Sequence, residues 1–489
     1  MGDAADRSLG GETAKGTAAK AAMAVVGFAG TVVLARLFDP AVFGGFYLLL
    51  SLVKLVDRPV RGFGTAAKKR FSEVGSRRSE VLGGQFLVTG LWVAFAGLGA
   101  LLLGDWLRSY TGLRDAPVLF VVLLAALGLY VSFERAVEAR GLLGVSFTAD
   151  AVRSYLTLPL QVGFIFLGFG AAGMAWGLAA ATFLSIPLLV RYVDAKPAVP
   201  SRETVESLLT YARYSIPGVV IGKAYDRFDV LLLGFLVGQS AAGNYEVAAK
   251  LTIPALIVAE VAGSGLMARA SNLHSEGRAV GLDVTNTLAF ASILAVPIFF
   301  GAVALAEPLV VTVYGPAYAE AGTLLVAIAL YRLVRTQNEP LLQTLDGLDR
   351  PDVTMRLSVA ALAVNIAFGV ALTLAVGPVG VALSTVLAEC VRYGWAARVV
   401  RRETAGVELL TRPFLEQVAT GLVMFLVVAG LHRVVPVRSW LHLGLLVGVG
   451  AVTYGATLFA ISSQLRYTVG TVLRGSRIEH LVPSRLLTE

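Results

Sequence analysis

The sequence predicts an all-α polytopic membrane protein with about fourteen transmembrane helices. Of its 489 residues, 56% are hydrophobic and only 15% are charged. Its mean hydropathy is +0.74. Soluble domains carry roughly 25% charged residues, so this chain cannot cover a water-facing surface in the usual way. A transmembrane helix needs about 20 apolar residues, and a chain of this length with short connections holds about twelve to fourteen of them.

Long apolar runs separated by short polar segments predict the individual helices. We expect them at residues 18–37, 42–61, 81–103, 116–137, 145–167, 171–193, 211–237, 241–267, 282–306, 317–345, 353–375, 379–397, 414–434 and 441–461. Pro217 and Pro297 lie inside two of the runs, and each predicts an interruption of its helix. The polar residues 1–20 continue into a full-length apolar run, so no cleavable signal peptide is expected.

The positions of Lys and Arg predict the orientation in the membrane. Connections after even-numbered helices and the C-terminal tail carry most of these residues, whereas connections after odd-numbered helices carry few. The positive-inside rule therefore places both termini in the cytoplasm. The net charge of +8 is thus a topology signal rather than a sign of nucleic-acid binding. The composition is rich in Ala, Arg, Val and Gly, which suits a GC-rich prokaryote, so we expect the protein in a prokaryotic plasma membrane.

A weak internal repeat of about 200 residues predicts two lobes of six helices each. Residues 170–173 recur as residues 377–380, and the motif at residues 43–47 recurs more loosely at residues 241–245. The predicted parts are an N-terminal lobe (1–200), a C-terminal lobe (201–405) and an appended pair of helices with a tail (406–489). Paired parallel repeats are typical of transporters that work by alternating access. A scaffold or a membrane enzyme built by duplication is the alternative.

Basic side chains inside the predicted helices are the candidate substrate-binding residues. An ionisable group in a spanning helix must face protein or water. Helical spacing places the cations of residues 54–61 on one stripe, and the same holds for residues 223–227. Cations outnumber acids in both segments, which favours an anionic substrate. The predicted cationic cavity consists of Lys54, Arg58, Arg61, Lys223, Arg227, Lys250, Arg332 and Arg335.

Each of these assignments has a structural alternative. Arg58 and Arg61 are as well placed to snorkel toward the headgroups as to bind a ligand. Arg335 has Glu339 one turn away, and in the fifth helix Arg153 has Asp150 at a similar spacing, so both arginines are candidates for local ion pairs.

Acidic residues in the helices are candidates for ion pairs or for coupling to a cation. They are Asp57, Asp226, Asp229 and Glu260. Glu246 has Lys250 one turn away, whereas Glu260 and Glu389 have no evident local cation. One cysteine and four histidines without a ligand-like spacing predict no disulfide and no metal centre. The chain has no GxxxxGK[ST] loop, so no nucleotide cofactor is expected.

The segment that links the first two predicted helices resembles the opening of Wzx-type polysaccharide flippases. It reads Leu-Ala-Arg-Leu-Phe-Asp-Pro-Ala-Val-Phe-Gly-Gly-Phe-Tyr over residues 34–47, and that family has an "LARxLGPxxFGxY"-like stretch there. Asp39 stands where the family often has glycine. Residues 226–245 and 314–321 are similar to the second half of the family. Its superfamily also contains the multidrug and toxin extrusion transporters and the lipid II flippases.

The resemblance implies two lobes around a V-shaped cavity lined by helices one, two, seven and eight. The expected function is that of a flippase, not an enzyme. It would move a polyprenyl-phosphate-linked oligosaccharide from the cytoplasmic to the outer leaflet for surface polysaccharide or glycoprotein glycan synthesis. The expected partners are this lipid-linked substrate, membrane lipids, and glycosyltransferases or a polymerase of the same pathway. The alternatives are a cation-coupled multidrug efflux antiporter, and a membrane glycosyltransferase or polymerase, for which no loop is long enough to form a catalytic domain. Residues 464–489 form either an interfacial segment or a disordered basic tail.

Overall fold

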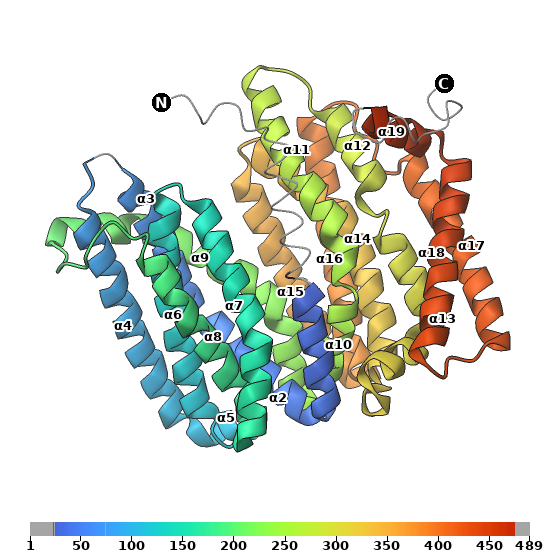
Figure 1. Cartoon of the computed structure of the whole chain (residues 1–489). Helices are drawn as coiled ribbons and strands as arrows, with labels where there is room; N and C mark the ends of the chain where they lie inside the picture. Colours follow the sequence, from blue (N-terminus) through green and yellow to red (C-terminus); the bar gives the residue numbers. More distant parts are fainter. Residues whose placement is uncertain (1–22, 24, 74, 475–489) are drawn as a thin grey trace. The chain divides into compact units, whose positions relative to one another are not determined.

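The computed structural model describes residue 23 and residues 25–73 and 75–474, and all regular elements in them are helical (Figure 1). This confirms the all-α fold class. The chain packs as two compact units, Met1–Glu246 and Val247–Glu489. The predicted division into two six-helix lobes (1–200 and 201–405) and an appended part (406–489) stays a prediction.

The first unit is built around α6. Its helices are Val25–Leu37, α2 (Pro40–Val56), α3 (Arg58–Ser72), α4 (Arg78–Leu102), α5 (Gly104–Thr111), α6 (Ala116–Ala139), α7 (Leu143–Phe164), α8 (Ala172–Val190) and α9 (Arg202–Leu236). Helices α2, α3, α4 and α8 all contact α6. The most apolar stretch of α6 is 67% buried, whereas that of α4 is 17% buried. The apolar surface of α4 is therefore available to lipid, and α6 forms the core.

Two glycines allow α2 to begin in contact with α10 (Gln239–Leu251). A Cβ atom on Gly44 would lie 1.9 Å from the carbonyl oxygen of Gln239, and one on Gly243 would lie 2.1 Å from that of Pro40. No other residue fits at such distances. These glycines belong to the two motifs of the predicted repeat, so the two related motifs pack backbone against backbone.

Where one helix was predicted at residues 42–61, α2 and α3 form a longer candidate span that is bent by 41°. The bend lies at Asp57, and Pro59 follows in the first turn of α3, where no backbone N–H is needed. The break frees backbone carbonyls that hydrocarbon cannot solvate. The Trp92 indole donates to the Val56 carbonyl at 2.7 Å, and Nε of Arg58 donates to the Lys54 carbonyl at 2.7 Å. The predicted single stripe of charges along residues 54–61 is therefore interrupted at Asp57.

The connection before α9 is fixed to the N-terminus of α4. Glu80 accepts hydrogen bonds from the Ser201 backbone N–H at 3.0 Å, from its hydroxyl at 2.5 Å and from the Thr204 hydroxyl at 2.7 Å. Glu80 thus caps the start of α9 from a different helix. Helix α9 continues without interruption through Pro217, so the predicted break there is wrong. One proline removes only one backbone donor, which a long helix in a packed unit tolerates.

The second unit is built around α14. Its helices are α11 (Ile257–Ser275), α12 (Gly281–Ala291), α13 (Ala295–Tyr314), α14 (Ala321–Gly347), α15 (Pro351–Val376), α16 (Val379–Glu403), α17 (Arg412–Val434), α18 (Trp440–Ile461) and α19 (Ser463–Arg474), with the short 3-10 turn Ile253–Leu256 before them. Helices α11, α13 and α16 pack against α14. The pair α17 and α18 packs against α13. The predicted interfacial tail includes α19, and its residues 475–489 lie outside the described part.

A second helix break separates α12, which ends at Ala291, from α13, which begins at Ala295. Pro297, where an interruption was predicted, follows in the first turn of α13. Two glutamines satisfy the carbonyls that this break frees. Gln337 of α14 donates to Leu288 at 3.3 Å, and Gln417 of α17 donates to Ala289 at 2.7 Å. The appended helix α17 therefore supplies a polar contact that the broken helix needs.

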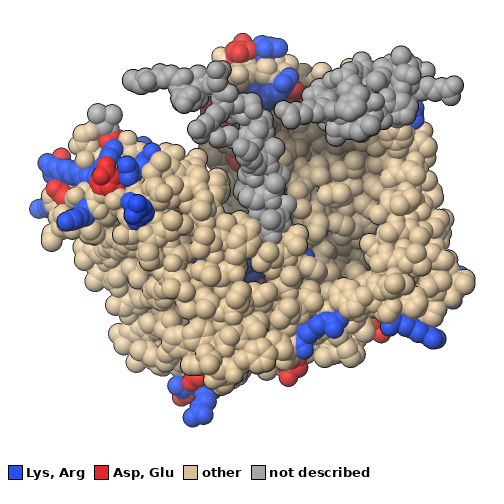
Figure 2. Space-filling view, in the orientation of Figure 1, with Lys and Arg blue, Asp and Glu red and all other residues tan. Residues whose placement is uncertain are grey.

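Within the described residues, nine helices are long and apolar enough to cross a membrane, and the bent pair α2–α3 makes ten. Helices α9, α14 and α16 have 35, 27 and 25 residues and carry charged side chains. Val25–Leu37 is the described part of the first predicted span. On the face drawn in Figure 2, Lys, Arg, Asp and Glu side chains gather mainly near its upper and lower edges, and the surface between them consists mostly of other residues. The chain is a multi-pass membrane protein, and the count of about fourteen spans stays a prediction.

Candidate functional site

The first group of predicted residues lies at the α2–α3 break. Asp57 is fully buried, and its Oδ2 pairs with Nε of Arg61 at 2.5 Å. Arg58 uses its Nε to bond the Lys54 carbonyl and makes no ion pair with a described residue. Lys54 is half-buried on the last turn of α2. Arg61 is thus neutralised by a carboxylate, whereas Arg58 makes no ion pair with a described residue.

The second group lies on α9 and reaches the first. Arg227 pairs with Glu246 of α10 at 2.9 Å, and Asp229 accepts a hydrogen bond from the Tyr245 hydroxyl at 2.6 Å. Asp226 and Arg227 lie within electrostatic range of Arg58. Two segments that are about 170 residues apart therefore meet in one unit.

Arg227 is neutralised across two helices by Glu246 of α10, and the surplus of positive charge expected of residues 223–227 stays a prediction. Its partner Glu246 has Lys250 as a sequence neighbour but bonds Arg227 across two helices. The Lys223 side chain lies outside the described part of the chain, so its predicted role stays a prediction.

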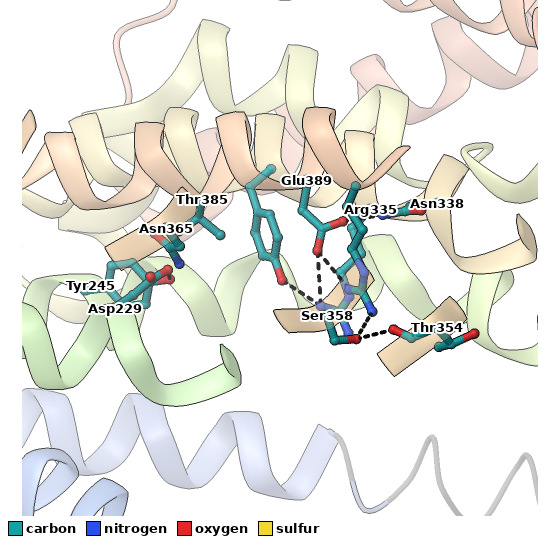
Figure 3. Close-up of polar contacts among 11 residues, drawn as sticks. Asp229, Tyr245, Arg335, Asn338, Thr354, Ser358, Asn365, Thr385 and Glu389 are labelled. Carbon is teal, nitrogen blue, oxygen red and sulfur yellow. Dashed lines mark hydrogen bonds and ion pairs between the residues drawn. The ribbon is translucent and has the colours of Figure 1, made fainter. Parts of the chain in front are cut away.

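The second unit contains a buried charged network centred on Glu389 of α16 (Figure 3). The Glu389 carboxylate has no exposed surface. Its Oε1 pairs with Arg335 at 3.6 Å and with Arg392 at 3.4 Å, and its Oε2 accepts from Asn338 at 2.6 Å. Arg392 also donates to the Ser358 hydroxyl at 3.1 Å. Glu389 thus joins α14, α15 and α16.

This network corrects the expectation that Glu389 has no local cation. Arg392 lies three residues later on the same helix, a spacing that the sequence displays. Arg335 pairs with Glu389, and Glu339 accepts a hydrogen bond from Gln343 at 2.9 Å. Arg392 and Asn338 are the site residues that sequence reasoning missed. The predicted pair of Arg153 with Asp150 is confirmed.

Arg332 differs from its neighbour Arg335, because it makes no ion pair with a described residue. Its guanidinium lies over the Tyr331 ring, 5.0 Å from the centroid, and its buried Nε has no hydrogen-bond partner. Of the other predicted residues in this unit, Lys250 is half-buried on α10 and Glu260 is exposed on α11.

The geometry divides the five predicted arginines into two classes. Arg61, Arg227 and Arg335 are neutralised by buried or nearly buried carboxylates. Arg58 and Arg332 carry guanidinium groups without a carboxylate among the described residues. Guanidinium groups bind phosphates and carboxylates through strong, charge-assisted hydrogen bonds. Arg58 and Arg332 are therefore the two best candidates for contacts with an anion.

The amino-acid sequence of the chain is similar to a protein family and to two relatives. Residues 33–322, more than half of the chain, match the model of the family described as polysaccharide biosynthesis protein. The probable flippase AglR of Haloferax volcanii is 26% identical over 454 residues, covering 89% of this chain and 92% of that protein. The probable low-salt glycan biosynthesis flippase Agl15 of the same organism is 24% identical, covering 74% of this chain and 76% of that protein.

Comparison with solved structures concerns the fold. The lipid II flippase MurJ in an inward closed conformation matches with a TM-score of 0.76 and 12% identity, covering 92% of this chain and 99% of that one. An inward-facing multidrug resistance transporter of the MATE family matches with a TM-score of 0.62 and 16% identity, covering 78% of this chain and 96% of that one. At such identities the likeness establishes a shared fold and nothing further.

Proposed function

The chain belongs to the polysaccharide biosynthesis protein family, and from this premise we propose that it is a flippase for a polyprenyl-phosphate-linked oligosaccharide. The substrate would move from the cytoplasmic to the outer leaflet by alternating access, for surface polysaccharide or glycoprotein glycan synthesis. Two relatives that carry the word flippase in their names support this proposal, and so does the fold shared with a lipid II flippase. The chain is then a transporter rather than an enzyme, in a prokaryotic plasma membrane with both termini in the cytoplasm.

One observation carries the assignment to an anionic substrate. Arg58 and Arg332 lie in helices of a membrane protein without a carboxylate partner among the described residues. A cation in such a place is costly unless it faces water or meets an anion. In this proposal each of them, within its own unit, provides a contact for an anionic group of the lipid-linked substrate. Lys54, Lys223 and Lys250 are the other basic residues of the predicted cavity. The paired residues Arg61, Arg227 and Arg335 hold their helices in place.

The proposal is tested by removing these two guanidinium groups. Hydrogen bonds to charged groups contribute about 1.5–3 kcal/mol each. Arg58→Gln and Arg332→Gln should therefore each lower export by about tenfold to a hundredfold. In the organism that carries the gene, we would measure surface glycan and the fraction of lipid-linked precursor that an impermeant reagent can reach. Precursor should accumulate in the protected cytoplasmic leaflet.

Matched controls are exposed arginines at helix ends of the same units. Arg202 is 91% exposed and Arg356 is 70% exposed, and their glutamine variants should export normally. If the gene is deleted and surface glycan does not change, the flippase assignment is wrong. A loss of drug resistance on deletion, with glycan intact, identifies the chain as an efflux antiporter instead.

A further inference from the structure

The second half of α14 has an accessible side that is polar. Between residues 335 and 347, every residue of the helix is buried except four, and all four have polar or charged side chains. Their spacings of four, four and three residues place them on one side of a helix. We call these residues the polar face of α14, and they are Arg335, Glu339, Gln343 and Asp346.

This face does not suit contact with lipid. On α15 of the same unit, the exposed large side chains are apolar, as lipid contact requires, and Val359 and Ile366 are 44% and 45% exposed. Ionisable side chains at accessible positions of a membrane protein face water instead. At 1.5 Å per residue, the polar face extends over about 17 Å from Asp346, at the end of α14, to Arg335. A wet path therefore follows α14 toward Arg332, which lies one turn further.

Two side chains in the middle of the face keep hydrogen-bonding groups available. Gln343 donates to Glu339 Oε1 at 2.9 Å, and neither residue makes another hydrogen bond or an ion pair with a described residue. The second oxygen of Glu339 and the carboxamide oxygen of Gln343 are therefore open to a ligand. Helix α11 presents no side chain beside them, because the residue there is Gly263. A Cβ atom on it would lie 3.5 Å from Glu339 Cγ and 3.1 Å from Gln343 Cγ.

The chemistry of these groups suits neutral hydroxyl groups. A carboxylate accepts hydrogen bonds from hydroxyls, and a carboxamide both donates and accepts. The Glu339 carboxylate has no cation partner among the described residues, so it would repel a phosphate or an acidic sugar. Arg335 is the one cation of the face, and it already pairs with Glu389 at 3.6 Å (Figure 3).

We propose that the polar face of α14 binds the neutral sugars of the lipid-linked substrate. This inference rests on the proposed function and adds to it a place for the glycan. Arg332 would meet an anionic group of the substrate, and the sugars would lie along Glu339, Gln343 and Asp346. One helix thus separates the charged part of the substrate from its neutral part.

Cysteine labelling tests whether this face is wet, and it needs no substrate. Cys390 is the only cysteine of the chain, so Cys390→Ser provides a background without thiols. In that background, Gln343→Cys and Glu339→Cys should each react with a charged methanethiosulfonate in open membrane fragments. Val359→Cys and Ile366→Cys are the controls and should stay unreacted, because these exposed positions face lipid. No reaction at residues 339 and 343 overturns the wet path.

Protection of the same thiol tests the ligand. The probe is a lipid extract of the organism that carries the gene, which contains its lipid-linked oligosaccharide under the proposed function. The control is the same extract after mild acid has released the glycan. The intact extract should slow the labelling of Gln343→Cys about twofold when half of the sites are filled, and the hydrolysed extract should not slow it.

The other outcomes separate this inference from the proposed function. In a protein whose deletion abolishes glycan export, equal labelling with both extracts overturns the sugar site. Slower labelling with tetraphenylphosphonium, and not with the intact extract, also overturns it and assigns the face to an organic cation. If deletion of the gene leaves surface glycan unchanged, the proposed function fails, whether or not residue 343 is wet.

Discussion

Replacing Glu389 by leucine should destabilise the second unit more than any substitution at an exposed ion pair. Glu389 is fully buried, and it is held by Arg335, Arg392 and Asn338. Leucine has a similar volume but leaves two guanidinium groups without this counterion, and their side chains are only 22% and 10% exposed. Removing one partner of a buried ion pair costs about 3–5 kcal/mol.

The expected thermal shift follows from this free energy. For a unit of about 150–250 residues, each kcal/mol lowers Tm by about 2–4 °C, so a loss of about 6–20 °C is expected if the unit unfolds cooperatively. Glu389→Gln should fall between leucine and the native residue, because the amide oxygen still accepts a hydrogen bond. The assay is loss of monodisperse protein after heating in detergent, followed by size-exclusion chromatography.

The matched control lies at the end of the same helix. Glu403 pairs with Arg350 at a site where the two side chains are 37% and 39% exposed. Surface pairs contribute about 0–1 kcal/mol, so Glu403→Leu should change Tm by a few degrees at most. Equal stability of Glu389→Leu and Glu403→Leu would show that the buried network does not hold α14, α15 and α16 together.

Two further predictions concern the backbone. Gln417→Leu leaves the Ala289 carbonyl without its donor at the α12–α13 break. We expect the free energy of unfolding to fall by about 1–3 kcal/mol. Unchanged heat stability in the same assay would mean that α17 does not support the break. Gly243→Ala places a methyl group 2.1 Å from the Pro40 carbonyl oxygen and should cost about 1–3 kcal/mol and reduce folded protein. Gly301→Ala is its control, because nothing lies within 4 Å of that position, and comparable yields of the two variants would contradict the close approach of α2 and α10.

Several features could be read from the sequence because they depend on local spacing or on composition. Apolar runs predict spans because a backbone in hydrocarbon must satisfy its own hydrogen bonds. The Asp150–Arg153 pair follows from a three-residue spacing on a helix. The same rule would have predicted Arg392 as a partner of Glu389.

Contacts between distant helices were decided by the tertiary structure alone. Hydropathy and spacing identify Arg227 and Glu246 as charged residues in apolar helices, but only packing makes them partners across two helices. Packing likewise separates Arg58 and Arg332, which have no carboxylate partner in the part of the chain that the structure describes, from Arg61 and Arg335, which do. The sequence by itself determined an all-α membrane protein with cations inside its helices. Which of those cations are already neutralised depends on side chains brought within about 4 Å from remote segments, and no local pattern encodes that distance.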